Sequence, residues 1–96
     1  MSAELPANAR LYVAVRFHLD AVPSPGLLPR LLQPFAKRDL VPDHLGSRRE
    51  GDTMQVEIAM DAMPAEVVHL VEGNLRQVVG VRTVVQTRTV EIRKVA

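Results

Sequence analysis

The period of the hydrophobic pattern changes along this chain, and that change constrains the fold more than any other feature. Over residues 11–17 strongly apolar side chains alternate with weaker or polar ones, the period-two pattern of a strand with one buried face. Over residues 27–35 the apolar residues fall at helical spacing and form one stripe. The chain is therefore predicted to begin with a strand followed by a helix.

The link between these two elements contains several breakers. Residues 18–26 include three prolines or glycines, so we expect the strand to end at Phe17 and a long loop to follow over residues 18–26. Ser24 is the predicted N-cap of the helix, and Pro25 suits its first turn. Pro34 is predicted to kink the helix or end it one residue earlier, with Phe35 still facing the core.

The next segment predicts a hairpin. Residues 40–47 have a weaker strand pattern that contains Pro42, and a proline within a strand predicts a position at the edge of a sheet. The turn at residues 50–52 returns the chain into residues 54–60, where apolar and polar side chains alternate clearly.

A second helix and a last strand complete the pattern. The helix is predicted to begin at Pro64 and to end at Gly80, because helices often end at a glycine in the left-handed conformation. The pattern of residues 81–95 predicts a strand. The order β-α-β-β-α-β predicts a ferredoxin-like α+β two-layer sandwich, with a four-stranded antiparallel sheet and two helices on one face. The predicted apolar stripe of the second helix is Val67, Val68, Val71, Leu75, Val78 and Val79.

Length and composition limit the possible functions. The 96 residues suffice for one domain, predicted at residues 10–96 after a flexible N-terminal arm at residues 1–9. Twelve basic and eleven acidic residues leave a net charge of +1, without the basic excess of a phosphate-bound nucleic-acid protein. Three aromatic residues disfavour an RNA-binding module of this topology. No apolar run approaches the ~20 residues of a membrane span, so we expect a cytoplasmic protein.

The sequence contains no convincing catalytic or metal site. Cysteine is absent, and no two of the histidines, His18, His44 and His69, have the spacing of metal ligands with a carboxylate beside them. A triad of Ser24, His44 and Asp20 can be assembled on paper, but no nucleophile-elbow pattern surrounds the serine. We therefore predict no catalytic residue, no metal, no cofactor and no enzymatic activity.

The start of the first helix is the better candidate site. The N–H groups of Gly26, Leu27 and Leu28 are expected to be free there and are placed to hold a carboxylate. The simpler interpretation is that Pro25 and Gly26 only begin a helix. Both interpretations remain open at this point.

Three motifs within the predicted βαββαβ order resemble an ACT domain. They are Pro-Gly-Leu-Leu at residues 25–28, Phe-Ala-Lys-Arg at residues 35–38, and the segment from Leu75 to Gly80-Val81. The resemblance covers residues 11–87 and is greatest to the small regulatory subunits of acetohydroxyacid (acetolactate) synthase.

The resemblance implies a regulatory protein that senses a branched-chain amino acid where two copies meet. It implies a homodimer through an edge strand and the first helix, and docking on a catalytic enzyme subunit. An edge strand with unpaired N–H groups also invites such pairing on physical grounds. The alternative is a ligand-free ferredoxin-like protein–protein interaction module. The ligand-binding positions implied by the resemblance are Ser24, Gly26, Leu27, Leu28, Val41 and Pro42.

Overall fold

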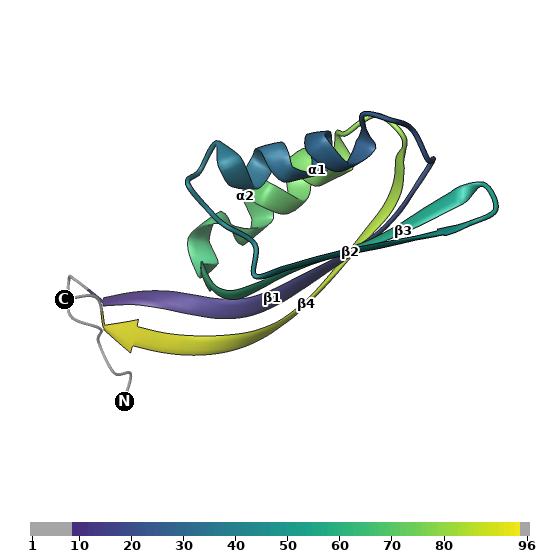
Figure 1. The fold of residues 1–96 in the computed structure, drawn as a ribbon. Helices are drawn as coiled ribbons and strands as arrows, with labels where there is room; N and C mark the ends of the chain where they lie inside the picture. Colours follow the sequence, from purple (N-terminus) through teal and green to yellow (C-terminus); the bar gives the residue numbers. More distant parts are fainter. Residues whose placement is uncertain (1–8, 95–96) are drawn as a thin grey trace.

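The structure, a computed structural model, describes the backbone of residues 9–94 and the side chains of residues 11–89. Its element order confirms the predicted ferredoxin-like fold (Figure 1). The strands form one antiparallel sheet in the order β2-β3-β1-β4. The elements are β1 (Ala9–Ala21), α1 (Leu27–Ala36), β2 (His44–Glu50), β3 (Thr53–Pro64), α2 (Ala65–Arg76) and β4 (Val81–Lys94).

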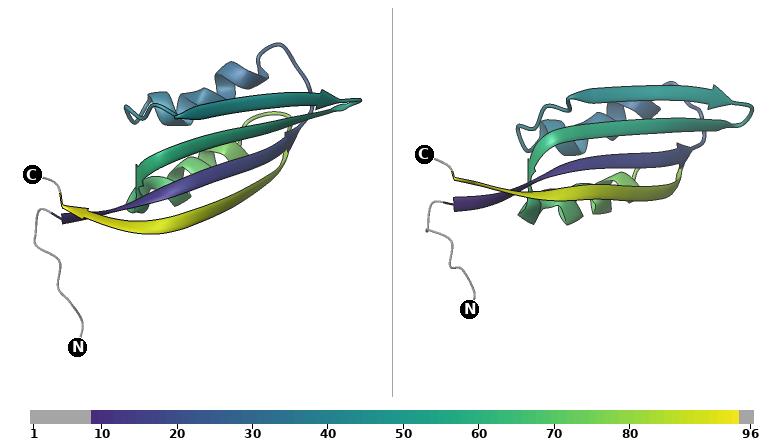
Figure 2. Two further views of the ribbon diagram at one scale, coloured as in Figure 1. Left: turned by 60° about the horizontal axis from the view of Figure 1, so that its bottom comes forward. Right: turned by 90° about the horizontal axis from the view of Figure 1, so that it is seen from below.

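Both helices lie on the same face of the sheet, and the other face is not covered by any described element (Figure 2). The helix α2 packs on β1, β3 and β4, and α1 packs beside α2. Because α2 occupies the β4 side, α1 lies over the β2 side of the sheet. The predicted arm, residues 1–9, lies outside the described residues except for Ala9, with which β1 begins.

The core lies between the sheet and the two helices. The odd-numbered residues of β1 from Val13 to Ala21 face it, as the alternation predicts, and Phe17 packs edge-to-face on Phe35 of α1 with the ring centroids 5.9 Å apart. The residues of the core are Val13, Val15, Phe17, Leu19, Ala21, Leu27, Leu31, Phe35, Val56, Ile58, Met60, Met63, Val68, Val71, Leu75 and Val84.

The prediction that the first strand ends before His18 is wrong. The strand β1 continues to Ala21, because Leu19 and Ala21 extend the alternation and are buried under the helices. The loop is therefore only residues 22–26, and Gly26 rather than Ser24 occupies the N-cap position, with no side-chain hydrogen bond.

The prediction that the first helix ends before Pro34 is also wrong, whereas the prediction that Phe35 faces the core is confirmed. The helix α1 continues through Pro34 to Ala36, and both Pro34 and Phe35 are buried. Proline has no N–H group, so one hydrogen bond is lost. The loss occurs near the end of this short helix, where no further helical turn depends on that bond. The guanidinium of Arg38 donates to the carbonyl oxygen of Pro34 at 2.8 Å and satisfies one of the last acceptors of the helix.

Two predicted element ends in the second half also need correction. The strand β2 begins at His44, so Pro42 precedes it, although β2 does form an edge of the sheet. The helix α2 ends at Arg76, and Val79 is 77% exposed rather than part of the apolar stripe. Gly80 has a φ of +95° outside the helix, and its carbonyl oxygen accepts a hydrogen bond from the N–H of Val22.

The contact between Phe17 and Phe35 leads to a stability prediction. We expect Phe17→Leu to lower the free energy of unfolding by about 1–2 kcal/mol, because it removes buried ring area and the edge-to-face pair. The matched variant Val85→Ala, at a position 57% exposed on the edge strand, should cost less than about 0.5 kcal/mol. Chemical denaturation measures both, and equal losses would contradict a core centred on this pair.

Candidate functional site

The predicted ligand-binding loop lies at the start of α1. Ser24 is exposed, Gly26 and Leu28 are partly exposed, and the side chain of Leu27 is fully buried in the core. The N–H of Leu27 donates to the carbonyl oxygen of Ser24 at 3.2 Å, so the expectation that it is free is wrong. The first turn of α1 contains no acidic residue and no side-chain cap. This turn therefore contains no carboxylate that would repel an anionic group.

A basic side chain that the sequence analysis did not single out lies against this helix start. The Arg30 guanidinium folds back over Gly26, and a Cβ atom added to Gly26 would lie only 3.1 Å from the Cζ of Arg30. The spacing of four residues is the signal that could have revealed it, because residues i and i+4 are neighbours on a helix. The absence of a side chain at Gly26 leaves room for the guanidinium to approach.

The two remaining predicted positions lie at the opposite end of α1. Val41 and Pro42 are in the connection between Ala36 and His44, so the ten residues of α1, about 15 Å of helix, separate them from Ser24. Val41 is 80% exposed. One chain does not bring the two groups of predicted residues together, and a shared site requires a second copy.

An apolar strip runs along the β2 side of α1. On the side of α1 that faces α2, Arg30, Gln33 and the C-cap residue Lys37 share a groove with the C-terminal end of α2. Helical spacing puts Leu28 and Leu32 on the side of α1 away from Arg30 and Gln33, and so away from α2. We call the partly buried or exposed residues on this side the α1–β2 flank: Leu28, Leu32, Leu40, Val41 and Leu45.

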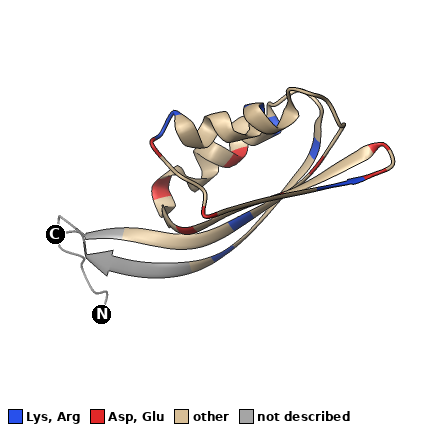
Figure 3. Ribbon diagram, in the orientation of Figure 1, with Lys and Arg blue, Asp and Glu red and all other residues tan. Residues whose placement is uncertain are grey.

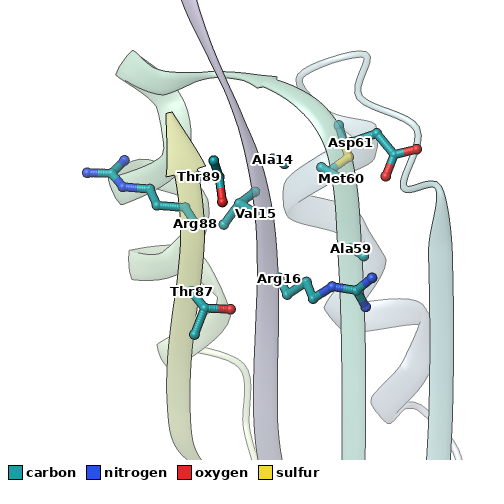
Figure 4. A pocket seen from close by; sticks show the side chains of 9 residues that line it. All are labelled: Ala14, Val15, Arg16, Ala59, Met60, Asp61, Thr87, Arg88 and Thr89. Atoms are coloured by element: carbon teal, nitrogen blue, oxygen red, sulfur yellow. The ribbon is translucent and has the colours of Figure 1, made fainter. Parts of the chain in front are cut away.

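The uncovered face of the sheet carries a shallow hollow of about 270 Å³ (Figure 4). Two small side chains, Ala14 of β1 and Ala59 of β3, lie in it. Arg16, Thr87 and Thr89 surround them, with Arg16 extending toward β3 in Figure 4. Its polar residues suit a polar ligand or water better than an apolar ligand.

Basic and acidic residues both occur along the strands and in the β2–β3 hairpin (Figure 3). Arg16 donates to Glu57 at 2.6 Å, and the imidazole Nε2 of His44 lies 3.8 Å from the other carboxylate oxygen of Glu57. The hydrogen bond from Arg16 is the main reason why the pKa of Glu57 lies below its usual value of 4.5, with the charges of Arg16, His18 and His44 contributing. Among the described residues, no three His, Asp or Glu side chains come together as a metal site.

The lowered pKa of Glu57 predicts a pH dependence of stability. A carboxylate with a folded pKa below its unfolded pKa stabilises the native state above about pH 4.5, and the contribution is lost as the pH falls through the folded pKa. We expect Glu57→Gln to reduce the fall in Tm between pH 6 and pH 3. The control Asp61→Asn should keep the wild-type fall, and thermal melts that show the reverse order would contradict the assignment to Glu57.

The fold and the sites now allow the chain to be classified. The βαββαβ sandwich with an open sheet face places it among small ferredoxin-like domains. Residues 8–93 match the family model of the ACT-like domain, so the chain belongs to the ACT-like domain family, whose domains are regulatory. No curated protein matches the chain. None of the described helices is both long and apolar enough to cross a membrane.

Proposed function

We propose that the chain is a small regulatory or activating subunit without catalytic activity of its own, acting in the cytoplasm. It docks on a biosynthetic enzyme such as acetolactate synthase and responds to a branched-chain amino acid. Membership of the ACT-like family supports the regulatory role. The observation that carries the ligand is the helix start at Gly26, which lacks acidic residues and lies under the Arg30 guanidinium.

The residues around Gly26 offer different contacts to the two ends of such a ligand. The carboxylate would lie against the N–H groups of Gly26 and Leu28 and the guanidinium of Arg30, because charge-assisted hydrogen bonds to a guanidinium are strong. The aliphatic side chain would contact Leu28 and, from a second copy, Val41 and Pro42. Leu27 contributes its backbone only, since its side chain is in the core.

The proposed homodimer is formed through β2 and α1. The strand β2 is an edge of the sheet, and one side of its backbone has no partner strand among the described residues. Pro42 lies before β2 and so does not interrupt this edge. The α1–β2 flank provides apolar area beside it, and twofold pairing of β2 would bring two such flanks together.

One observation favours the alternative of a ligand-free interaction module. The first turn of α1 contains no acidic side chain to hold the amino group of an amino acid. In this alternative the chain would keep the same dimer and activate its partner enzyme by contact alone.

A thermal-shift screen against the twenty amino acids at millimolar concentration tests the ligand. A ligand that binds only the native state raises Tm by linkage, so valine, leucine or isoleucine should raise it. Arg30→Gln should abolish this rise, whereas Arg88→Gln, an equal change of charge on β4 away from the proposed interface, should preserve it. The absence of any shift with the wild-type dimer would overturn ligand binding in favour of the interaction module.

The dimer has its own test. We expect light scattering at micromolar concentration to give twice the monomer mass of 10.6 kDa. Val41→Asp with Leu45→Asp should produce a folded monomer, because two charges would be buried in the interface. The control Val79→Asp, an exposed position at the other end of α1, should remain a dimer. A wild-type monomer, or a dimer that survives the double change, would contradict pairing through this flank.

A further inference from the structure

A groove separates α1 from the C-terminal end of α2 on the outer side of the helix layer. Its volume is about 350 Å³, within the range of sites for small molecules. The residues that line it are Arg30, Gln33, Pro34, Lys37, Asn74, Gln77, Val78 and Val79. The groove is distinct from the α1–β2 flank, because it lies on the opposite side of α1.

The charge of this groove has one sign. Arg30 and Lys37 are its two ionisable residues, and no carboxylate lines it. Among the described residues, neither basic side chain forms a salt bridge or a side-chain hydrogen bond, although Arg16, Arg48 and Arg76 each pair with a glutamate. The pair of cations, one on α1 and one at its C-cap, therefore stays uncompensated within the described chain.

The spacing of these cations suggests how many anionic groups a ligand carries. Arg30 and Lys37 are seven residues, or two helical turns, apart, which corresponds to about 10 Å along the axis. A single small ion could contact both charged groups only if both side chains were fully extended toward it. A molecule with two anionic groups, or a chain of phosphates, can contact both.

Amide side chains supply the remaining polar contacts. Gln33, Asn74 and Gln77 line the groove and carry NH₂ donors suited to anionic oxygen atoms. The Oδ1 of Asn74 is buried with no hydrogen-bond partner among the described residues, and because this oxygen is an acceptor, only the NH₂ group of Asn74 can contact an anion. Val78 and Val79 add apolar area for the part of a ligand that is not charged.

We propose that this groove binds a small multivalent anion, a molecule that carries a diphosphate or two carboxylates. Arg30 and Lys37 hold its anionic groups, and the amides of Gln33, Asn74 and Gln77 donate hydrogen bonds to them. This site takes a ligand without a positive charge and is separate from the proposed amino-acid site, with which it shares only Arg30. It gives a regulatory domain a second input.

The test is a titration of the full ¹⁵N-labelled chain followed by NMR. Sodium pyrophosphate and disodium succinate are the two probes, and sodium chloride at equal ionic strength is the reference. We expect one or both probes to shift the side-chain NH₂ signals of Gln33, Asn74 and Gln77 to saturation, and sodium chloride not to do so. Pyrophosphate binding alone would identify a phosphate site, and succinate binding alone a dicarboxylate site.

Two variants that each remove one positive charge test whether binding depends on the groove. Lys37→Gln should weaken the saturating probe at least tenfold and leave the response of Tm to branched-chain amino acids unchanged, since Lys37 lies away from Gly26. Arg88→Gln, an equal change of charge on β4 away from α1 and β2, should change neither. The proposal is overturned if the shifts grow linearly with every salt, if they map to the β2–β3 hairpin, or if Arg88→Gln weakens the probe as much as Lys37→Gln. If the wild-type chain binds pyrophosphate but its Tm does not respond to branched-chain amino acids, only the proposed effector is rejected.

Discussion

The pairing of β1 with two neighbours along its length is the constraint on which the rest of this structure depends. β1 is hydrogen-bonded to β3 on one side and to β4 on the other. These pairings fix which side chains of three strands face the helices, because a shift of one residue would reverse every side chain of a strand. They place Phe17 under Phe35. They also bring the end of β1 beside the start of β4, where the N–H of Val22 donates a hydrogen bond to the carbonyl oxygen of Gly80. The short loop before α1 and the direction of α1 follow from that position.

The sequence predicts the fold well wherever the hydrophobic period is long and regular. The odd positions of β1 from Val13 to Ala21 and the stripe of α2 at Val68, Val71 and Leu75 are buried as the pattern indicates, whereas Leu11 is 40% exposed. Predictions based on single prolines and glycines were less successful. Pro34 lies inside a helix because packing of Phe35 outweighs one lost hydrogen bond near the helix end. Gly80 does have a positive φ, but its role is in the connection to β4, and only the tertiary contact with Val22 reveals this.

The candidate site could be predicted only in part. The motif at residues 25–28 does place a loop and a helix start at the surface, but periodicity does not show that Leu27 points into the core while Gly26 remains accessible. Arg30 was missed because a basic residue in a helix is normally read as a solvated surface residue. Its significance depends on a side chain folding back over a glycine, which is a contact in space. The groove between α1 and α2 joins residues some forty positions apart, and no local pattern indicates that they meet.

The uncovered face of the sheet gives this small domain a separation of roles within single strands. In β1 the odd-numbered residues from Val13 to Ala21 build the core, whereas Ala14, Arg16 and His18 face outward. An outward residue can therefore be exchanged without repacking the interior, and neighbouring outward residues on β3 and β4 can be exchanged with it. Such a face is an independent surface on which new recognition properties could be acquired, by natural variation or by engineering, at little expense of folding. The same scaffold could in this way serve different partner proteins while its interior stays the same.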